Sequence, residues 1–149
     1  MDLKRLIGEY LADAKLMQLA TLDNGQPWVC SVNYVHDAEW NLYWLSLRSR
    51  RHSRELLGYS KVAGAIIKDP SVKRGLQFEG VAREVDSQEL LRVHELYCES
   101  YGNKPERLAE ARSGKQNSRT YYALKLTNVV LYDEVNFPAD PRREYKLLN

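Results

Sequence analysis

The chain reads Leu16-Met-Gln-Leu-Ala-Thr-Leu22, then Asp23-Asn-Gly-Gln-Pro27, then Trp28-Val-Cys-Ser-Val-Asn-Tyr-Val35. The first and third segments are rich in aliphatic, β-branched and aromatic residues, which favour β-strands. The Asn-Gly pair between them favours the positive φ angles of a tight hairpin turn. This stretch therefore predicts a β-hairpin and antiparallel pairing.

Four further regions have strand composition, and the predicted strands are 16–22, 28–35, 41–46, 61–67, 75–85 and the last strand region, 119–126 with 129–132. Helices are predicted at the N-terminus, after the third strand over 55–58, over 86–102 and from Pro105 onward. Strands with regular turns and few helices indicate a mainly β fold, an antiparallel barrel with peripheral helices. One domain is expected over 1–149, with a loose polar tail over 137–149.

Composition excludes several classes of protein. The 149 residues carry 22 Lys and Arg against 20 Asp and Glu, a net charge of +2, and 44% of residues are hydrophobic. This balance is that of an ordinary soluble globule, and it does not favour nucleic acid or a membrane as a partner. Without a recognisable secretion signal, a cytoplasmic location is expected. Cys30 and Cys98 lack the spacing of a disulfide framework or zinc site, so both are expected to be structural thiols, and no metal site is predicted.

The most informative polar segment is Ser46-Leu-Arg-Ser-Arg-Arg-His52. It stands at the end of a predicted strand and just before a predicted helix. Guanidinium groups pair with phosphate oxygens, a serine hydroxyl adds a donor, and a helix N-terminus offers free N–H groups. The segment by itself is compatible with either a phosphate site or a solvated basic loop.

Several short motifs occur in a characteristic order: Leu19-Ala-Thr-Leu22 with Gly25 and Pro27, Leu42-Tyr-Trp-Leu-Ser46, Arg51-His52, Val62-Ala63 and Gly75-Leu-Gln-Phe-Glu-Gly80. This order resembles the pyridoxamine 5'-phosphate oxidase-like FMN-binding split β-barrel superfamily, over roughly residues 1 to 135. The resemblance is to its short members, such as the general stress proteins. It implies a six-stranded antiparallel split β-barrel that forms a homodimer.

The resemblance also implies a set of FMN-binding residues. In the family a hydroxyl residue at the end of the third strand and a Ser-Arg-Lys-like triplet hold the phosphate, and Ser46, Arg50, Arg51 and His52 match these positions. His52 stands where the family has lysine, so its charge depends on pH because an unperturbed histidine titrates near 6.5.

The same comparison places part of the second strand along the isoalloxazine ring. Val32, Asn33 and Tyr34 correspond to residues that contact the flavin largely through backbone groups. A half-buried barrel aromatic is the alternative role for Tyr34. Lys115-Gln-Asn-Ser118 is similar to a loop by which the partner subunit reaches FMN.

Two departures from the family pattern limit what the resemblance implies. Gly75 stands where the oxidase has a flavin-contacting glutamine, and the oxidase's C-terminal substrate signature is missing after Tyr132. The expected function is therefore FMN binding with a flavin-dependent oxidoreductase activity on a small redox substrate that the sequence does not name. A non-catalytic flavin-binding or flavin-buffering stress protein is the alternative, and haem or a deazaflavin are rival cofactors. The sequence assigns no catalytic residue.

Overall fold

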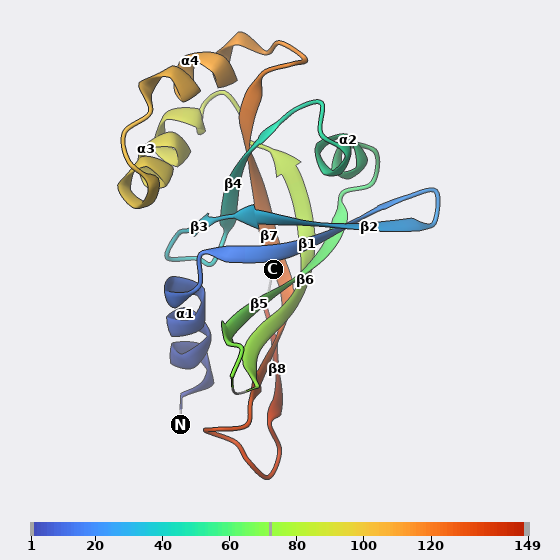
Figure 1. Cartoon of the computed structure of the whole chain (residues 1–149), viewed down its shortest axis with the longest axis vertical. Coiled ribbons are helices and arrows are strands. Elements are labelled where there is room, and N and C mark those ends of the chain that lie inside the picture. The colour runs from blue at the N-terminus through green and yellow to red at the C-terminus, as the bar shows by residue number, and fades with distance from the viewer. Residues whose placement is uncertain (1, 72, 148–149) are drawn as a thin grey trace.

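The structure is a computed structural model that describes residues 2–71 and 73–147. Helices and strands follow in the order α1 (Leu3–Asp13), β1 (Leu16–Asp23), β2 (Gln26–Asn33), β3 (Val35–His36), β4 (Leu42–Leu47), α2 (Arg51–Gly58), β5 (Lys61–Asp69), β6 (Arg74–Glu84), α3 (Leu90–Tyr101), α4 (Pro105–Ser113), β7 (Arg119–Asp133) and β8 (Arg142–Lys146). The strands form one antiparallel sheet in the order β2-β1-β5-β6-β7-β4-β3, with β8 added to β7. Figure 1 shows the sheet curling around itself, with α1, α2 and the α3–α4 pair at its margins.

The predicted hairpin is present. Asn24 and Gly25 have φ angles of 49° and 79°, and Asp23 pairs with Gln26 across the turn. Positive φ at both central positions is the property that an Asn-Gly pair supplies. The local sequence is therefore enough to set the register of β1 against β2.

The second strand is interrupted at Tyr34, and the barrel is split at this interruption. Beyond it, Val35 and His36 form β3 and pair with Tyr43 and Leu42 of β4. Before it, β2 pairs with β1 alone and leaves its other edge open beside the end of β4. The sheet thus closes at β3 and opens between β2 and β4, which is the arrangement of a split barrel.

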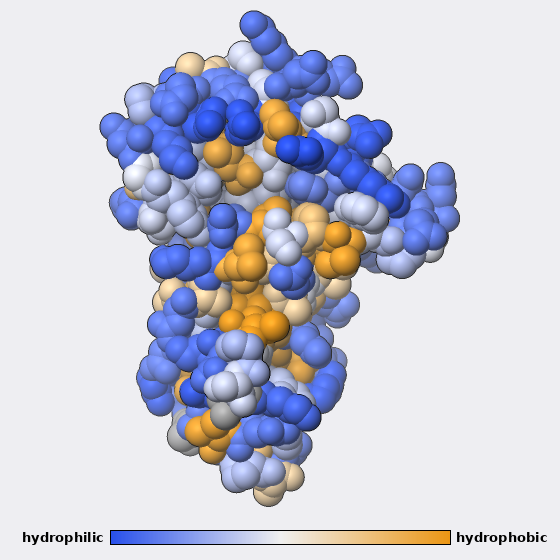
Figure 2. All heavy atoms as spheres, in the orientation of Figure 1, coloured by the Kyte–Doolittle hydropathy of each residue, from blue (hydrophilic) through white to orange (hydrophobic). Residues whose placement is uncertain are grey.

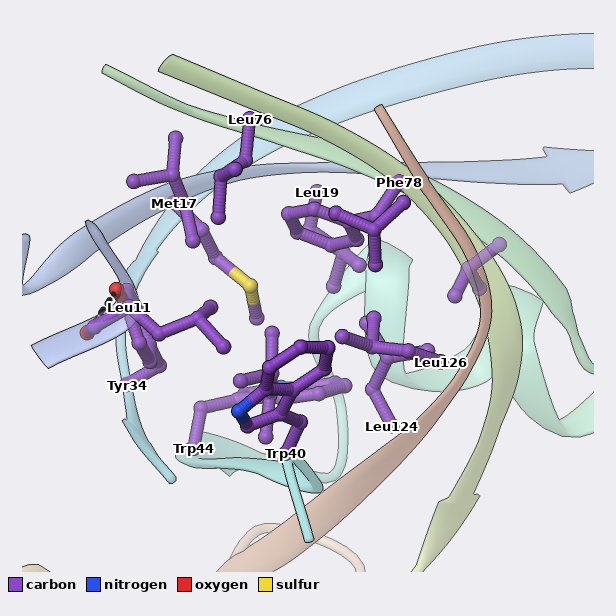
Figure 3. Close-up of a cluster of buried hydrophobic side chains, with 14 of the residues drawn as sticks. Leu11, Met17, Leu19, Tyr34, Trp40, Trp44, Leu76, Phe78, Leu124 and Leu126 are labelled. Atoms are coloured by element: carbon purple, nitrogen blue, oxygen red, sulfur yellow. Dashed lines mark hydrogen bonds between the residues drawn. The ribbon is translucent and has the colours of Figure 1, made fainter. Parts of the chain in front are cut away.

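The barrel interior is a continuous apolar core. Met17, Leu19, Trp44 and Leu124 are fully buried in it, and Figure 3 shows their side chains converging from β1, β4 and β7. α1 packs its apolar stripe against this core, as its sequence pattern predicts. Close packing also explains a glycine, because a Cβ at Gly64 would lie 2.5 Å from the Phe78 ring.

A second, smaller apolar cluster lies on the opposite side of β4 and β7. Tyr43 and Tyr121 project to that side and pack against Val93 and Tyr97 of α3 and Leu108 of α4. The two helices therefore cover the outer face of these strands, next to the point where β4 ends.

The prediction of a mainly β antiparallel split barrel with peripheral helices is confirmed, and three details differ. The described part of the chain contains eight strands rather than six. The predicted strand 28–35 divides into β2 and β3 at Tyr34, whose carbonyl accepts from the Tyr101 side chain, and β8 lies in the expected loose tail. Residues 142–146 of that tail pair with β7, because the β7 edge still has free backbone groups there.

Two helix starts also differ from the prediction. α2 begins at Arg51, so the basic segment forms the helix start itself, rather than a loop before it. α3 begins at Leu90, because residues 87–89 form a turn in which the Glu89 N–H donates to the Asp86 carbonyl. Gly102 ends α3 and Pro105 starts α4, both as predicted. Among the described residues, no helix has the length and apolar character needed to cross a bilayer.

Candidate functional site

A cavity of about 310 Å³ lies at the split of the barrel, where β2 leaves β4. Its walls come from β2, the end of β4, the start of α2, α3 and the start of β7: Ser31, Val32, Asn33, Leu45, Ser46, Leu47, Arg50, His52, Tyr97 and Arg119. Five of the seven predicted FMN-binding residues, Val32, Asn33, Ser46, Arg50 and His52, line this one cavity. The fold thus gathers residues that are up to 20 positions apart in the sequence.

Ser46 and His52 form the polar floor of the cavity. His52 Nε2 lies 3.0 Å from Ser46 Oγ, and His52 is only 8% exposed. Burial lowers the pKa of His52 below its usual 6.5, and the nearby positive charge of Arg50 lowers it further, while Glu55 opposes the shift. At neutral pH the imidazole is therefore neutral in the ligand-free protein.

The start of α2 adds hydrogen-bond donors. Arg50 is the N-cap residue in extended conformation, and it provides no side-chain cap. The backbone N–H groups of Arg51, His52 and Ser53 have no acceptor within the described ranges, as expected for the first turn of a helix. These N–H groups and the positive end of the helix dipole favour an anion at this point.

The open edge of β2 contributes backbone groups. The Tyr34 N–H donates to the Lys15 carbonyl at 3.0 Å, so Tyr34 faces β1. Directly opposed residues of an antiparallel pair alternate between bonded and non-bonded positions. The N–H and C=O groups of Ser31 and Asn33 therefore point away from β1, toward the open edge and the cavity, whereas Val32 bonds to β1.

Two predicted residues lie outside the cavity. Arg51 points away from it, its Nε donates to the Glu55 carboxylate at 2.8 Å, and its guanidinium stacks 4.1 Å from the centre of the Trp28 ring. Tyr34 is 2% exposed, and its hydroxyl donates to the Leu11 carbonyl at 2.7 Å inside the core (Figure 3).

Neither residue is among those that line the cavity. Tyr34 also has both backbone groups occupied, because its carbonyl accepts from the Tyr101 hydroxyl at 2.7 Å. Tyr34 is therefore the barrel aromatic of the alternative interpretation. Arg51 is the first residue of α2, so its backbone N–H is one of the unpaired donors of the first helical turn.

The basic segment also contains an arginine with a structural role. Arg48 is largely buried, and it donates to the Glu84 carboxylate at 3.0 Å and to the Ala111 carbonyl at 2.9 Å. It also donates to the Ser118 hydroxyl. Arg48 thus fastens the α3–α4 excursion and the loop 115–118 to the barrel, and it does not line the cavity.

Sequence reasoning missed five residues of the cavity: Ser31, Leu45, Leu47, Tyr97 and Arg119. The period-2 alternation of β2 contained a signal for Ser31, because Ser31 and Asn33 share a side of the strand. No local pattern distinguishes Tyr97 or Arg119, because only the packing of α3 and β7 brings them to the split.

A larger cavity of about 500 Å³ lies beside the start of α3. Its charged side chains largely satisfy one another, as in the pairs of Arg83 with Glu89 at 3.0 Å and Arg92 with Asp37 at 4.0 Å. Size alone therefore does not make it the functional site. Within residues 2–71 and 73–147, no group of three or more His, Cys, Asp or Glu side chains is placed to hold a metal ion.

Comparison with known proteins gives relatives of several kinds. UPF0306 protein YhbP of Salmonella schwarzengrund is 31% identical over 93 residues, which is 60% of this chain and 63% of that protein. The chain therefore matches less than two thirds of the length of this relative. The crystal structure of HutZ, the haem storage protein of Vibrio cholerae, has 27% identity and a TM-score of 0.69, covering 85% of this chain and 91% of HutZ.

A second solved structure is similar in fold alone. General Stress Protein 26 of Bacillus anthracis has 15% identity and a TM-score of 0.68, covering 99% of this chain and all of that one. The family model described as Pyridoxamine 5'-phosphate oxidase matches residues 3–132. That match spans the strands β1 to β6, all of β7 except its last residue, and every residue that lines the cavity. The chain belongs to the pyridoxamine 5'-phosphate oxidase family.

Proposed function

We propose that this protein binds FMN in the cavity at the split. One observation carries the proposal. Ser46, Arg50 and His52 lie with the first turn of α2 on one side of the cavity, and the open edge of β2 lies on the other side. The first group suits a phosphate, and free strand-edge groups suit the polar edge of a planar ring.

The donor set fits FMN on chemical grounds. A hydroxyl, an imidazole, a guanidinium and unpaired helix N–H groups are all phosphate donors, and among the described residues no carboxylate lines the cavity to repel an anion. The backbone groups of Ser31 and Asn33 supply both N–H donors and C=O acceptors along the open edge. Ser46, Arg50 and His52 would hold the phosphate, and β2 would hold the ring.

The proposal includes a homodimer. Figure 2 shows apolar side chains gathered along the middle of the face over β1 and β5. Leu16, Val29, Ile67 and Val81 are each more than 40% exposed, and strand alternation places them on the outer face of β1, β2, β5 and β6, respectively. Exposed apolar patches of this kind mark interaction surfaces. Since Ser31 and Asn33 point to the same face, a second copy seated on it would border the cavity.

The chemical role that we propose is that of a flavin-dependent oxidoreductase on a small redox substrate. Bound FMN supplies hydride acceptance and donation. The chain's own residues then bind and orient the cofactor, and among the described residues that line the cavity the neutral His52 is the one histidine. The alternative is a protein that binds flavin without turnover.

Haem is the second candidate cofactor because HutZ is a haem storage protein. An axial haem ligand must be accessible, yet His52 and His94 are 8% and 5% exposed and already bonded to Ser46 and Tyr121. His36 is partly exposed, with Nδ1 3.2 Å from the Asp37 carbonyl oxygen. His36 lines a separate cavity of about 110 Å³, and not the cavity at the split. The donor set at the split therefore favours FMN.

The test is a parallel titration of purified protein with FMN, riboflavin and haemin, followed by flavin fluorescence and absorption. Riboflavin is the matched control because it has the same ring and lacks the phosphate. We expect FMN to bind at least about tenfold more tightly than riboflavin, in line with hydrogen bonds to a charged group. Equal affinities would contradict the phosphate site, and haemin bound in place of FMN would overturn the cofactor assignment.

A second measurement separates the enzyme from the binding protein. Anaerobic stopped flow with NADH or NADPH follows the loss of oxidised flavin absorption. Reduction well above the rate for free FMN supports an oxidoreductase. A rate equal to that of free FMN supports flavin binding without turnover.

A further inference from the structure

The cavity at the split contains a second cation that the phosphate site does not use. Arg50 stands at the start of α2, whereas Arg119 is the first residue of β7 and pairs in register with Leu47 of β4. Successive side chains of a strand point to opposite faces of a sheet. Arg119 and Leu47 therefore lie on the face that α3 and α4 cover, and Ser46 points to the other face.

The guanidinium of Arg119 is only partly engaged. The Glu110 carboxylate accepts from the Arg119 backbone N–H at 2.6 Å and lies 3.5 Å from Nη1. Glu110 is also paired with Arg107 at 2.9 Å. Within the described ranges, Nε and Nη2 of Arg119 have no acceptor, and the side chain is 39% exposed. Glu110 thus anchors one end of the guanidinium and leaves its other donors for a ligand.

Tyr97 of α3 lines the same cavity as Arg119. Its ring is fixed by contacts with Tyr101 and Tyr121, at centroid distances of 4.7 and 5.5 Å. Its hydroxyl has no hydrogen-bond partner in the described part of the chain, and it is not one of the fully buried unpartnered atoms. Tyr97 is 9% exposed, so a phenol with little solvent exposure and a partly engaged guanidinium line the same cavity.

We propose that Arg119 and Tyr97 form a subsite for the carboxylate of a small organic molecule, the substrate class of this cavity. A guanidinium fork matches the planar geometry of a carboxylate, and the phenol adds a second donor. Leu45 and Leu47 provide apolar surface in the same cavity for the body of that molecule. The position beside a flavin rests on the proposed function, whereas the binding of the carboxylate does not depend on FMN.

The chemistry of the subsite favours a carboxylate over a second phosphate. One guanidinium and a neutral phenol carry a single positive charge, and Glu110 offsets part of it. The phosphate site at the start of α2 has Arg50, His52 and unpaired helix N–H groups. Arg50 is therefore expected to contribute to phosphate binding, and Arg119 to carboxylate binding.

The test crosses two probes with two arginine variants. The probes are 4-fluorobenzoate, followed by fluorine NMR on the ligand-free protein, and FMN, followed by fluorescence. Arg119→Gln should weaken 4-fluorobenzoate by about fivefold to tenfold, reduced from the full effect of a charged hydrogen bond because the site is partly exposed. The same variant should leave FMN within about twofold, and Arg50→Gln should show the reverse pattern.

Two further variants keep the test independent of folding defects. Tyr97→Phe removes a single oxygen atom and should weaken 4-fluorobenzoate alone. Arg119→Lys keeps the charge without the fork and should fall between wild type and Arg119→Gln. Inorganic phosphate added in competition should displace FMN and leave 4-fluorobenzoate in place.

Each outcome decides the proposal. Absence of 4-fluorobenzoate binding, or equal weakening by Arg50→Gln, would overturn the subsite. An FMN affinity that falls with Arg119→Gln would assign Arg119 to the FMN site and would also overturn it. If wild-type protein fails to bind FMN, the proposed function fails, and the 4-fluorobenzoate comparison still decides the subsite.

Discussion

His52 Nε2 and Ser46 Oγ lie 3.0 Å apart, and this contact joins the first turn of α2 to the end of β4. The contact closes the floor of the cavity and holds a neutral imidazole where the proposed phosphate would sit. Burial lowers the pKa of His52 in the free protein, whereas a phosphate dianion in contact with the imidazole would raise that pKa.

FMN binding is expected to depend on pH through His52. Contact with phosphate favours the imidazolium form, so the pKa of His52 rises in the complex from its lowered value in the free protein. The added affinity is present in full below the free-protein pKa and is lost as pH rises through the raised pKa of the complex. FMN affinity measured from pH 5 to 9 should fall more steeply in wild type than in His52→Gln or His52→Lys. The FMN phosphate itself ionises near pH 6, and this effect is the same for wild type and both variants, so the comparison between them removes it.

Parallel pH profiles for wild type and both variants would show that His52 does not touch the phosphate. Ser46 and the helix N–H groups would then be the remaining donors, together with Arg50.

Arg50 and Arg51 should differ in their effect on FMN binding. Arg50 lines the cavity, while the Arg51 side chain is held by Glu55 and Trp28 outside it. Arg50→Gln should weaken FMN by about 1 to 2 kcal/mol, and Arg51→Gln by less than about 0.5 kcal/mol. Fluorescence titration checks the difference. A larger loss from Arg51→Gln would mean that Arg51 leaves Trp28 when FMN binds, which Trp28 fluorescence would report.

The homodimer predicts a change of association state when charge enters the outer face. Ile67 is 62% exposed on β5, so Ile67→Lys adds a charge there without disturbing the core. Sedimentation velocity should show dimer for wild type and monomer for the variant, because an unpaired charge in an interface is costly to desolvate. Leu91→Lys, at a 48% exposed position on α3, is the matched control. A monomeric wild type at micromolar concentration would contradict the prediction.

β8 should contribute to stability, although the sequence predicts a loose tail. Its Tyr145 packs edge-on against Trp40 with ring centroids 5.6 Å apart, and Trp40 is only 8% exposed. Tyr145→Ala should reduce the free energy of unfolding by about 1 to 2 kcal/mol in urea denaturation, from the lost aromatic pair and burial. Lys146→Ala, on the same strand with an exposed side chain, should have little effect. Equal stability of wild type and Tyr145→Ala would show that β8 is not stably attached.

Acid should destabilise the folded protein through protonation of Asp133. Its carboxylate is fully buried and accepts hydrogen bonds from the Tyr10 hydroxyl and from the backbone N–H groups of Val135 and Asn136. Burial opposes the charge, but these hydrogen bonds and Arg74 outweigh it and hold the pKa of Asp133 below 3.8. The stabilisation is therefore complete above the unfolded-state value near 3.9 and is lost as pH falls through the lower folded-state pKa.

The measurement is urea unfolding of wild type and Asp133→Asn between pH 7 and pH 2.5. At pH 7 the variant should be about 1 to 3 kcal/mol less stable, the range for hydrogen bonds to a charged group. The gap should narrow below about pH 4, as the wild-type carboxyl takes up a proton. A stability difference between the two proteins that does not change with pH would show that the charge of Asp133 does not stabilise the fold.

The sequence by itself determined the features that depend on neighbours along the chain. Asn24 and Gly25 fix the β1–β2 register because their φ preference is a property of two residues. The apolar stripe of α1 and the start of α4 at Pro105 follow from local periodicity and from the fixed φ of proline.

Only the tertiary structure decided which side chains face the cavity. Tyr34 and Asn33 are adjacent, yet pairing with β1 turns the backbone groups of Tyr34 inward and those of Asn33 toward the open edge. Arg51 and Arg50 are equally basic, yet Trp28 and Glu55 hold only Arg51 away from the split. Pairing, curvature and long-range packing set these directions, and no residue carries that information in its own type or in its neighbours along the chain.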